Sequence, residues 1–253
     1  MTENVYRIKS ASGESSLDRA IAQCSIIAEN KYFSEGILLK CVDAKPLYLY
    51  LHYALFTNPD HELRTAQIDQ AIRDLHLRPK SLFGAYDEIC VIQKVSSSEN
   101  SKLPSHRHAG FIVILFKLLD DQTKHDRLEK SWLSWSGARE IYKYSPRSWN
   151  LRKIALHKFP KEIKTNHKPF AYVLLCEFGS ILNPSNRLEA LNMVERLRVR
   201  NCGYISLYQI QWSYGRTCSP SQASTNMHRS ATSATRSDRN QMMRAFSQEV
   251  EIL

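Results

Sequence analysis

The sequence predicts an α+β fold in which a mixed or antiparallel sheet is packed by two or three helices. The chain has 253 residues, of which 43% are hydrophobic, and this is enough to bury one large core. Short apolar or alternating runs, typical of strands, are separated in places by amphipathic segments of helical period. We therefore divide the chain into an N-terminal helical arm (1–35), a single α+β core domain (36–214) and a flexible tail (215–253).

The first half of the chain is predicted to hold two helices and four strands. Ser15 or Ser16 can cap the first helix, whose apolar residues recur at helical spacing from Leu17 to Ala28. Strands are predicted over 36–42, 46–56, 87–95 and 109–119, and a second helix over 61–76. The run at 109–119 is apolar enough to be buried on both faces of a sheet.

The second half is predicted to add three strands and one helix before a disordered basic tail. The strands cover 148–159, 168–178 and 203–212. The helix covers 186–199 and places on one face Leu188, Leu191, Val194 and Leu197. Residues 215–240 are largely Ser, Thr, Arg and Asn, so they cannot bury enough apolar surface to offset the entropy of ordering.

Cysteine usage and hydropathy restrict the environments that suit the chain. Six cysteines are scattered without a CxxC pair, which predicts free, mostly buried thiols in a reducing compartment. We expect no secretory signal, and no run reaches the 18 apolar residues of a spanning helix, so any membrane contact is expected to be peripheral. Glycine-rich phosphate loops and nucleophile elbows are also missing from the sequence.

Positive charge is concentrated in one stretch of the chain. The net charge is +10, and residues 124–168 hold twelve Lys and Arg against four acids. Aromatic residues are interleaved with these charges, a combination typical of surfaces that bind nucleic acid or an anionic membrane. The predicted binding patch consists of Lys143, Arg147, Arg152, Lys153, Lys158, Lys161, Lys164 and Lys168. Five tail arginines extend it: Arg216, Arg229, Arg236, Arg239 and Arg244.

A histidine pair stands just before the most apolar strand, in "PSHRHAGFIVIL" (104–115). Residues two apart on a strand point to the same face, so His106 and His108 could both reach one metal ion. This region resembles the HUH endonucleases of rolling-circle replication, in which a metal polarises the scissile phosphate and a tyrosine attacks it. The resemblance implies Tyr142 or Tyr144 as that nucleophile.

The histidine region departs from the HUH pattern in three ways. Arg107 lies between the histidines, where the family has an apolar residue, and Pro146 shortens any helix that carries the tyrosines. A third ligand is not evident, since Asp87 and Glu88 are only candidates. The alternative is that the histidines form the polar entrance to a strand. We adopt this alternative and expect no enzymatic activity, no metal and no cofactor.

Three segments follow the order of a known group of viral proteins. Residues 45–72, "KPLYLYLHYALFTNPDHELRTAQIDQAI", run from an alternating strand through a polar turn into an amphipathic helix. Residues 167–194 open with a basic-Pro-Phe entry to a long strand, and 203–212 form a closing strand. In this pattern the chain resembles, over residues 36–212, the rhabdovirus matrix proteins, and the plant-infecting members that mature in the nucleus come nearest in length. The proline-rich budding motifs of many animal members, PPxY and PTAP, are missing.

The matrix-protein resemblance implies a structural protein that bridges the nucleocapsid and the inner face of the envelope. Such a protein self-associates and condenses the nucleocapsid during assembly and budding. The implied partners are the nucleocapsid or its RNA, an anionic membrane surface, further copies of the chain and the envelope glycoprotein. The implied location is beneath the virion envelope and, in the host, the nucleus or membranes of the cytoplasm. A further alternative is an RNA-binding regulator or silencing suppressor, which would bind RNA without binding membranes.

Overall fold

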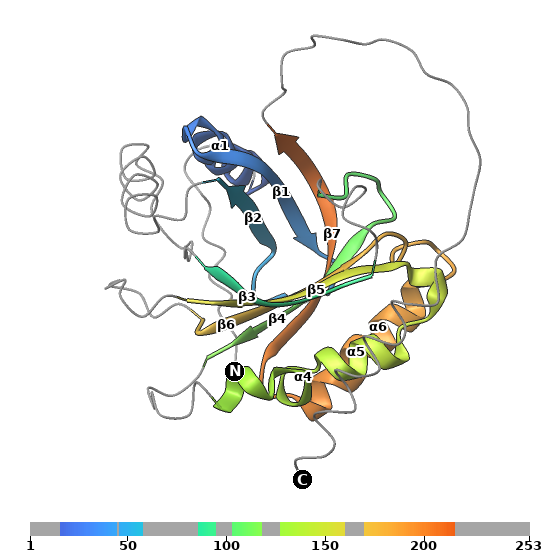
Figure 1. Ribbon diagram of the computed structural model, residues 1–253. Helices are drawn as coiled ribbons and strands as arrows, with labels where there is room; N and C mark the ends of the chain where they lie inside the picture. The colour runs from blue at the N-terminus through green and yellow to red at the C-terminus, as the bar shows by residue number, and fades with distance from the viewer. Residues whose placement is uncertain are drawn as a thin grey trace, which may run out of the picture.

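The computed structural model describes residues 16–44, 46–57, 86–94, 103–117, 127–159 and 170–215, which build one antiparallel sheet with helices packed on it (Figure 1). The strands are β1 (Phe33–Cys41), β2 (Tyr50–Phe56), β3 (Asp87–Gln93), β4 (Gly110–Phe116), β5 (Leu151–Lys158), β6 (Tyr172–Phe178) and β7 (Tyr204–Gly215). The helices are α1 (Ser16–Glu29), α4 (Trp132–Trp135), α5 (Ala138–Tyr144), α6 (Arg187–Arg200) and the 3-10 turn η1 (Arg147–Trp149). The α+β class and all seven predicted strands are confirmed. The helix predicted over 61–76 and the predicted disordered tail lie outside the described residues.

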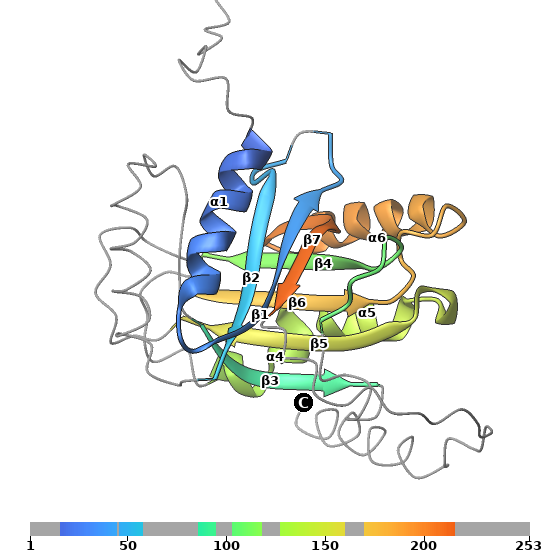
Figure 2. The same ribbon diagram turned by 90° about the horizontal axis from the view of Figure 1, so that it is seen from above.

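The strands lie in the order β2-β1-β7-β4-β6-β5-β3, and every neighbouring pair is antiparallel. The sheet is strongly curved, so that β1 and β2 pass over the strands β3 to β6 (Figures 1 and 2). Its outer face is covered by the helices, and its inner face is enclosed by the strands themselves. The boundary expected at residue 35, between a helical arm and the core, falls within β1, and α1 packs on the same sheet.

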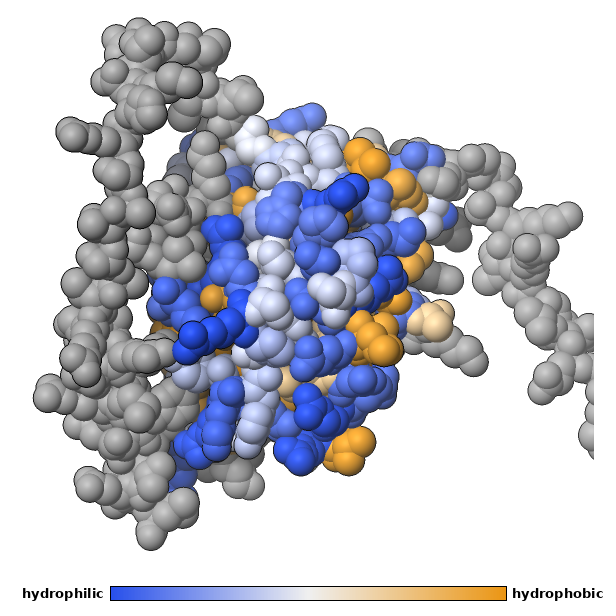
Figure 3. All heavy atoms as spheres, turned by 90° about the vertical axis from the view of Figure 1, so that its right-hand side faces the viewer, coloured by the Kyte–Doolittle hydropathy of each residue, from blue (hydrophilic) through white to orange (hydrophobic). Residues whose placement is uncertain are grey.

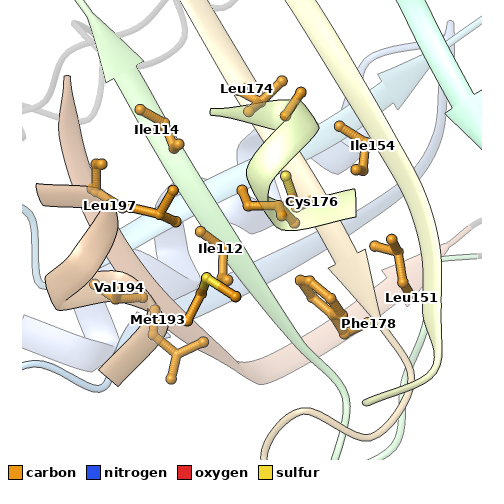
Figure 4. Close-up of a cluster of buried hydrophobic side chains, with 14 of the residues drawn as sticks. Ile112, Ile114, Leu151, Ile154, Leu174, Cys176, Phe178, Met193, Val194 and Leu197 are labelled. Atoms are coloured by element: carbon orange, nitrogen blue, oxygen red, sulfur yellow. The ribbon is translucent and has the colours of Figure 1, made fainter. Parts of the chain in front are cut away.

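The outer face of β4, β5 and β6 forms the larger core with α4, α5 and α6. Alternate strand residues reach this core, because side chains alternate between the two faces of a sheet. Figure 4 shows Ile112 and Ile114 of β4 beside Met193, Val194 and Leu197 of α6. The other labelled residues of this core, from β5 and β6, extend away from α6: Leu151, Ile154, Leu174, Cys176 and Phe178. Trp149, the largest of the fully buried side chains, lies in the same core.

The packing face of α6 differs in part from the predicted one. The helix buries Ala190, Met193, Val194 and Leu197, which have i, i+3, i+4, i+7 spacing. The prediction of burial is confirmed at Val194 and Leu197 but is wrong at Leu188, whose side chain is 71% exposed. Leu188 precedes Ala190 by two residues, and a two-residue step turns an α-helix by about 200°. The surface seen from the right of Figure 1 is mostly hydrophilic, with apolar residues in small groups (Figure 3).

The helix α1 covers the outer face at the other end of the sheet. Cys24 of α1 is buried against Leu38 of β1. Tyr214 of β7 lies beside this contact, with its ring stacked on Phe33 at 5.1 Å between centroids and its hydroxyl hydrogen-bonded to Nε2 of His52. This layer joins α1, β1, β2 and β7 into one packed unit.

The cysteines in the described ranges are free, as predicted. Cys24, Cys41 and Cys176 are buried, Cys90 is half-buried and Cys202 is exposed. Burial raises the pKa of the Cys24 thiol to about 11, so this thiol stays protonated at neutral pH. The reducing compartment stays a prediction, and Cys218 lies outside the described residues.

Arg198 connects α6 to two neighbouring segments. Its Nη2 donates to Oδ2 of Asp43 at 2.5 Å, and its Nε and Nη2 donate to the carbonyl of Ile205 at 2.9 and 2.7 Å. The Asp43 side chain is only 9% exposed. We expect Arg198→Ala to lower the free energy of unfolding by about 2 kcal/mol, because a buried carboxylate and a carbonyl lose their donors.

Urea unfolding with an alanine control tests the Arg198 prediction. Arg200 lies one half-turn further along α6 and also pairs with an acid, Glu140, but its side chain is 64% exposed. Exposed ion pairs contribute little, so Arg200→Ala should cost less than about 1 kcal/mol. Equal losses in the two variants would contradict the proposed role of Arg198.

Candidate functional site

The inner face of the curved sheet carries a second apolar core. Its buried members are Ile37, Leu39, Cys41, Phe111, Val113, Leu115, Phe170, Leu175 and Tyr208. Six half-buried residues pack around them: Tyr48, Leu51, Tyr53, Leu103, Val173 and Ile210. A small set of polar side chains lies in or beside this apolar interior. We call it the inner-face site, and it consists of Tyr53, Glu88, Arg152, Lys153, His157 and Glu177.

The centre of the inner-face site is a contact between Tyr53 of β2 and His157 of β5, 104 residues apart in the sequence. The Tyr53 hydroxyl lies 3.4 Å from Nε2 of His157, and the two rings meet edge to face at 5.7 Å between centroids. Which of the two groups donates depends on the imidazole tautomer. The His157 side chain is buried, and its Nδ1 makes no well-formed hydrogen bond to the described residues.

Burial sets the protonation of both groups in this contact. It lowers the pKa of His157, an effect that Glu88 opposes and Lys153 reinforces. Burial also raises the pKa of the Tyr53 phenol, and Glu88 adds to that rise. The imidazole is therefore neutral at neutral pH and can both donate and accept a hydrogen bond, while the phenol keeps its proton.

Glu88 and Lys153 connect the buried pair to the surface. Oε2 of Glu88 lies 3.8 Å from Nε2 of His157 and accepts a hydrogen bond from Nζ of Lys153 at 2.5 Å. The Glu88 and Lys153 side chains are 36% and 31% exposed, whereas that of His157 is 7% exposed. Polar groups thus continue from the interior to solvent, along β5 and its neighbour β3.

Arg152 and Glu177 form a second, more buried pair on β5 and β6. Nε of Arg152 lies 2.7 Å from Oε1 of Glu177, and the two side chains are 19% and 11% exposed. Burial raises the pKa of Glu177, Arg152 and Lys153 lower it in part, and Glu35 of β1 adds to the rise. An anion is retained here only because a cation compensates the loss of hydration.

The structure does not bring the described members of the predicted basic patch onto one surface. Lys143 and Arg147 are exposed on α5 and η1. Arg152 and Lys153 belong to the inner-face site, where each pairs with an acid. Lys158 pairs with Glu129, which also accepts a hydrogen bond from Tyr172 of the outer core. Lys161, Lys164, Lys168 and the five tail arginines lie outside the described residues.

His106 and His108 lie in a turn before β4 and not on the strand. The same-face geometry of a strand therefore does not apply to them, and their ring centroids are 6.4 Å apart. Nε2 of His108 accepts a hydrogen bond from Nε of Arg107 at 3.2 Å. No group of three or more His, Cys, Asp or Glu side chains in the described ranges is placed to hold a metal ion.

Tyr142 and Tyr144 belong to a different group of residues, the α5 basic cluster, which also contains Lys94, Lys143 and Arg147. Nζ of Lys94 lies 4.6 Å from the centroid of Tyr142, and Nζ of Lys143 lies 5.3 Å from that of Tyr144. Burial lowers the pKa of Lys94, and the nearby charge of Arg147 adds to this effect. Lys94 directly follows β3, which two strands separate from β4 and the histidine turn.

Sequence reasoning missed the central residues of the inner-face site. His157 and Glu177 carried one available signal, because each is a polar residue inside an otherwise apolar strand, in "IALHKF" and "VLLCEF". A polar side chain within an apolar strand is buried, so it needs a hydrogen-bond partner in the protein interior or on a bound ligand. Tyr53 carried no comparable signal, since its contact with His157 exists only because the sheet curves.

Comparison with known proteins gives a family without an assigned function. A family model described as a domain of unknown function, DUF7153, matches residues 33–210, a range that contains the whole inner-face site. A search of the curated proteins finds no match. A solved structure described as an anthrone oxidase-like protein is similar over 78% of this chain and 86% of that chain, with 11% identity and a TM-score of 0.41. We base no conclusion on a likeness this weak.

Proposed function

Because the chain belongs to the DUF7153 family, whose description assigns no activity, we propose its function from the inner-face site: it binds a small, mainly apolar molecule that carries a hydrogen-bonding group. The observation behind this proposal is the buried contact of Tyr53 with His157 in an apolar interior. Sites for small molecules typically combine apolar walls with a few polar groups that converge on one place.

The energetic cost of the polar groups supports a binding role. Burying a hydroxyl or an imidazole without a full set of hydrogen bonds costs free energy, and apolar residues of similar size would pack here without that cost. By strict geometry Nδ1 of His157 has no hydrogen-bond partner in the described residues, although the backbones of Ala155 and Val173 lie close enough to raise the pKa of the imidazole. The hydrogen bonding of this buried ring is therefore weak, and it is the Nε2 contact with Tyr53 that carries the proposal. Curved sheets with about eight strands have interiors that either fill with side chains or hold one small ligand.

The neutral imidazole narrows the chemistry of the ligand. A neutral His157 pairs best with an uncharged hydroxyl or carbonyl, since it has no charge with which to bind an anion. The apolar walls come from five strands, β1, β2, β4, β6 and β7. We therefore infer a ligand with a compact apolar body and one neutral polar group, such as a phenol.

Two matched probes test the proposed binding. 2-Naphthol carries the required hydroxyl and naphthalene lacks it, so the ratio of their dissociation constants isolates the polar contact. We expect saturable binding of 2-naphthol. Tyr53→Phe should reduce the ratio of the naphthalene and 2-naphthol dissociation constants by about fivefold, because one net hydrogen bond contributes about 1 kcal/mol.

The control for the probe experiment is Tyr86→Phe. The Tyr86 hydroxyl donates to the carbonyl of Phe170 at 3.1 Å, so it borders the same apolar core without contacting His157. Its removal should leave the ratio of the two probes unchanged. The proposal fails if neither probe binds saturably, or if Tyr53→Phe and Tyr86→Phe have the same effect.

The α5 basic cluster favours a second candidate function, binding of a polyanionic surface, which the matrix-protein resemblance also implies. Its cations lie close enough for Arg147 to affect the pKa of Lys94, and the Tyr144 side chain is 53% exposed beside Lys143. Like charges held together with exposed rings attract phosphate groups. No helix in the described ranges is long and apolar enough to cross a membrane.

Flotation with vesicles of phosphatidylserine and phosphatidylcholine tests this second function. Each basic residue near an anionic surface contributes about 1 kcal/mol, so replacing Lys143 and Arg147 with alanine should weaken binding by roughly thirtyfold. Added salt should weaken the wild type in the same direction. The control exchanges Lys153, which pairs with Glu88, for alanine. If the variant with alanine at both Lys143 and Arg147 still floats with the vesicles, the α5 basic cluster does not bind the anionic surface.

A further inference from the structure

Glu35 of β1 lies on the inner face of the sheet. Ile37 and Leu39 of the same strand belong to the inner apolar core, and side chains alternate along a strand, so the Glu35 side chain is directed to that face as well. The intervening Gly36 faces the outer layer, because a Cβ there would meet the ring of Tyr214. Glu35 is half-buried. A carboxylate therefore borders the apolar interior of the inner-face site.

Strand pairing brings Glu35 close to Tyr53. Tyr53 of β2 lies opposite Ile37 of β1, and Leu55 lies opposite Glu35. Glu35 and Tyr53 are therefore diagonal neighbours on one face of an antiparallel pair, a position within reach of long side chains. Their electrostatic contact agrees with this placement, since burial is the main cause of the raised pKa of Tyr53 and the charge of Glu35 adds to the rise. The Glu35 carboxylate thus acts on the hydroxyl on which the proposed binding depends.

Glu35 differs from the two carboxylates of the inner-face site in its partners. Glu88 pairs with Lys153 at 2.5 Å, and Glu177 pairs with Arg152 at 2.7 Å. Among the described residues, no lysine or arginine forms an ion pair with Glu35. Its negative charge is therefore available to a group that enters the site, whereas the charges of the other two carboxylates are compensated from β5.

The hydrogen bonding of Glu35 leaves part of its carboxylate open to a further donor. Its Oε2 accepts a hydrogen bond from the backbone N–H of Leu103 at 3.0 Å, and the Leu103 side chain packs against the inner apolar core. A carboxylate can accept about four hydrogen bonds, so Glu35 retains acceptor capacity beside this contact. Because a half-buried anion with few donors costs free energy, a donor on a bound molecule would lower that cost.

We propose that Glu35 determines which polar group the inner-face site selects: its carboxylate accepts a hydrogen bond from the ligand, so a hydroxyl is preferred to a carbonyl or an ether oxygen. An ionised carboxylate can only accept hydrogen bonds. A hydroxyl can donate to Glu35 while its oxygen contacts Tyr53, whereas a carbonyl or an ether has no hydrogen to donate. Hydrogen bonds to a charged acceptor are also stronger than neutral ones. This inference rests on the proposed function and narrows its ligand to a hydroxyl compound such as a phenol.

2-Naphthol and 2-methoxynaphthalene test this selection, because they share the ring and the oxygen but only 2-naphthol has a hydrogen to donate. We expect the wild-type chain to bind 2-naphthol at least about tenfold more tightly. Glu35→Gln keeps an acceptor for the N–H of Leu103, removes the charge and adds an amide that can donate to an ether oxygen. It should reduce the ratio of the 2-methoxynaphthalene and 2-naphthol dissociation constants by about tenfold. Any steric effect of the methyl group is common to both proteins and cancels in this comparison.

Glu140→Gln is the matched control, since Glu140 of α5 pairs with Arg200 of α6 on the outer side of the sheet and should leave the ratio unchanged. Naphthalene, which has no polar group, should bind the wild type and Glu35→Gln equally and shows that the site is intact. Equal binding of the two probes to the wild type would overturn the inference, as would an unchanged ratio in Glu35→Gln. In both cases saturable binding of 2-naphthol would leave the proposed function in place. If neither naphthalene nor 2-naphthol binds saturably, the proposed function fails and this inference fails with it.

Discussion

Arg152→Ala is expected to lower the free energy of unfolding by about 3 kcal/mol at neutral pH, because it leaves a buried carboxylate without its nearest cation. Arg152 and Glu177 are 2.7 Å apart, and their side chains are 19% and 11% exposed. At this depth the desolvation of Glu177 persists after the cation is removed. The loss therefore exceeds what an exposed ion pair contributes.

The pH dependence of this loss has a definite sign. Burial already raises the pKa of Glu177, and Arg152 acts against that rise, so Arg152→Ala raises the pKa further. A carboxyl whose pKa is raised in the folded state favours folding once it is protonated and disfavours it when ionised. The difference between wild type and Arg152→Ala should therefore be largest above the raised pKa. It should shrink as the pH falls towards 4.5, the ordinary carboxyl value.

Two further variants separate the buried charge from lost packing. Arg152→Met combined with Glu177→Leu removes both charges and keeps apolar bulk, so it should recover most of the lost stability. Lys153→Ala, next in sequence, removes a cation whose partner Glu88 is 36% exposed and should cost less than about 1 kcal/mol. Urea unfolding from about pH 5 to pH 8 measures all of these. A loss in Arg152→Ala that does not change with pH would rule out the buried carboxylate as its cause.

The strands could be predicted from sequence because burial leaves a local pattern. The run "GFIVILF" is apolar at every position, and β4 is buried on both faces by the outer and inner cores. The buried face of α6 was harder to predict, because not every leucine of this helix packs into the core. Leu188 fits a helical repeat by itself but lies outside the packing face that Ala190 and Met193 define.

The inner-face site could not be predicted, because it depends on the path of the sheet and not on a motif. The dense charge from 124 to 168 suggested one basic surface. Strand alternation divides that stretch instead, with Lys153 towards Glu88 and Lys158 towards Glu129 on the outer side. A linear charge count therefore overestimates a surface wherever the stretch includes a strand. The expected membrane and nucleocapsid roles stay predictions, and the flotation experiment bears on the first of them.

Acidification from pH 7 to pH 4 is expected to lower the free energy of unfolding by about 3 kcal/mol through the protonation of His52 alone. His52 lies in the packed layer formed by α1, β1, β2 and β7. Burial lowers the pKa of His52 to about 4, from an ordinary value of 6.5. Its ring stacks on Tyr214 at 5.7 Å between centroids, and its Nε2 is hydrogen-bonded to the Tyr214 hydroxyl. Protonation would place a charge in this apolar layer.

The sign follows from where the proton binds. Between pH 6.5 and pH 4 the unfolded chain binds a proton at His52 and the folded chain does not, so stability falls as the pH falls through this window. His52→Phe keeps an aromatic ring against Tyr214 and removes the titration, so its stability should decline less on acidification than that of the wild type. Tyr214→Phe removes the hydrogen bond but keeps the buried imidazole, whose burial is the main cause of the lowered pKa, so its pH dependence should persist. If His52→Phe declines as steeply as the wild type, the proton is taken up elsewhere and the layer between α1 and β2 does not limit acid stability.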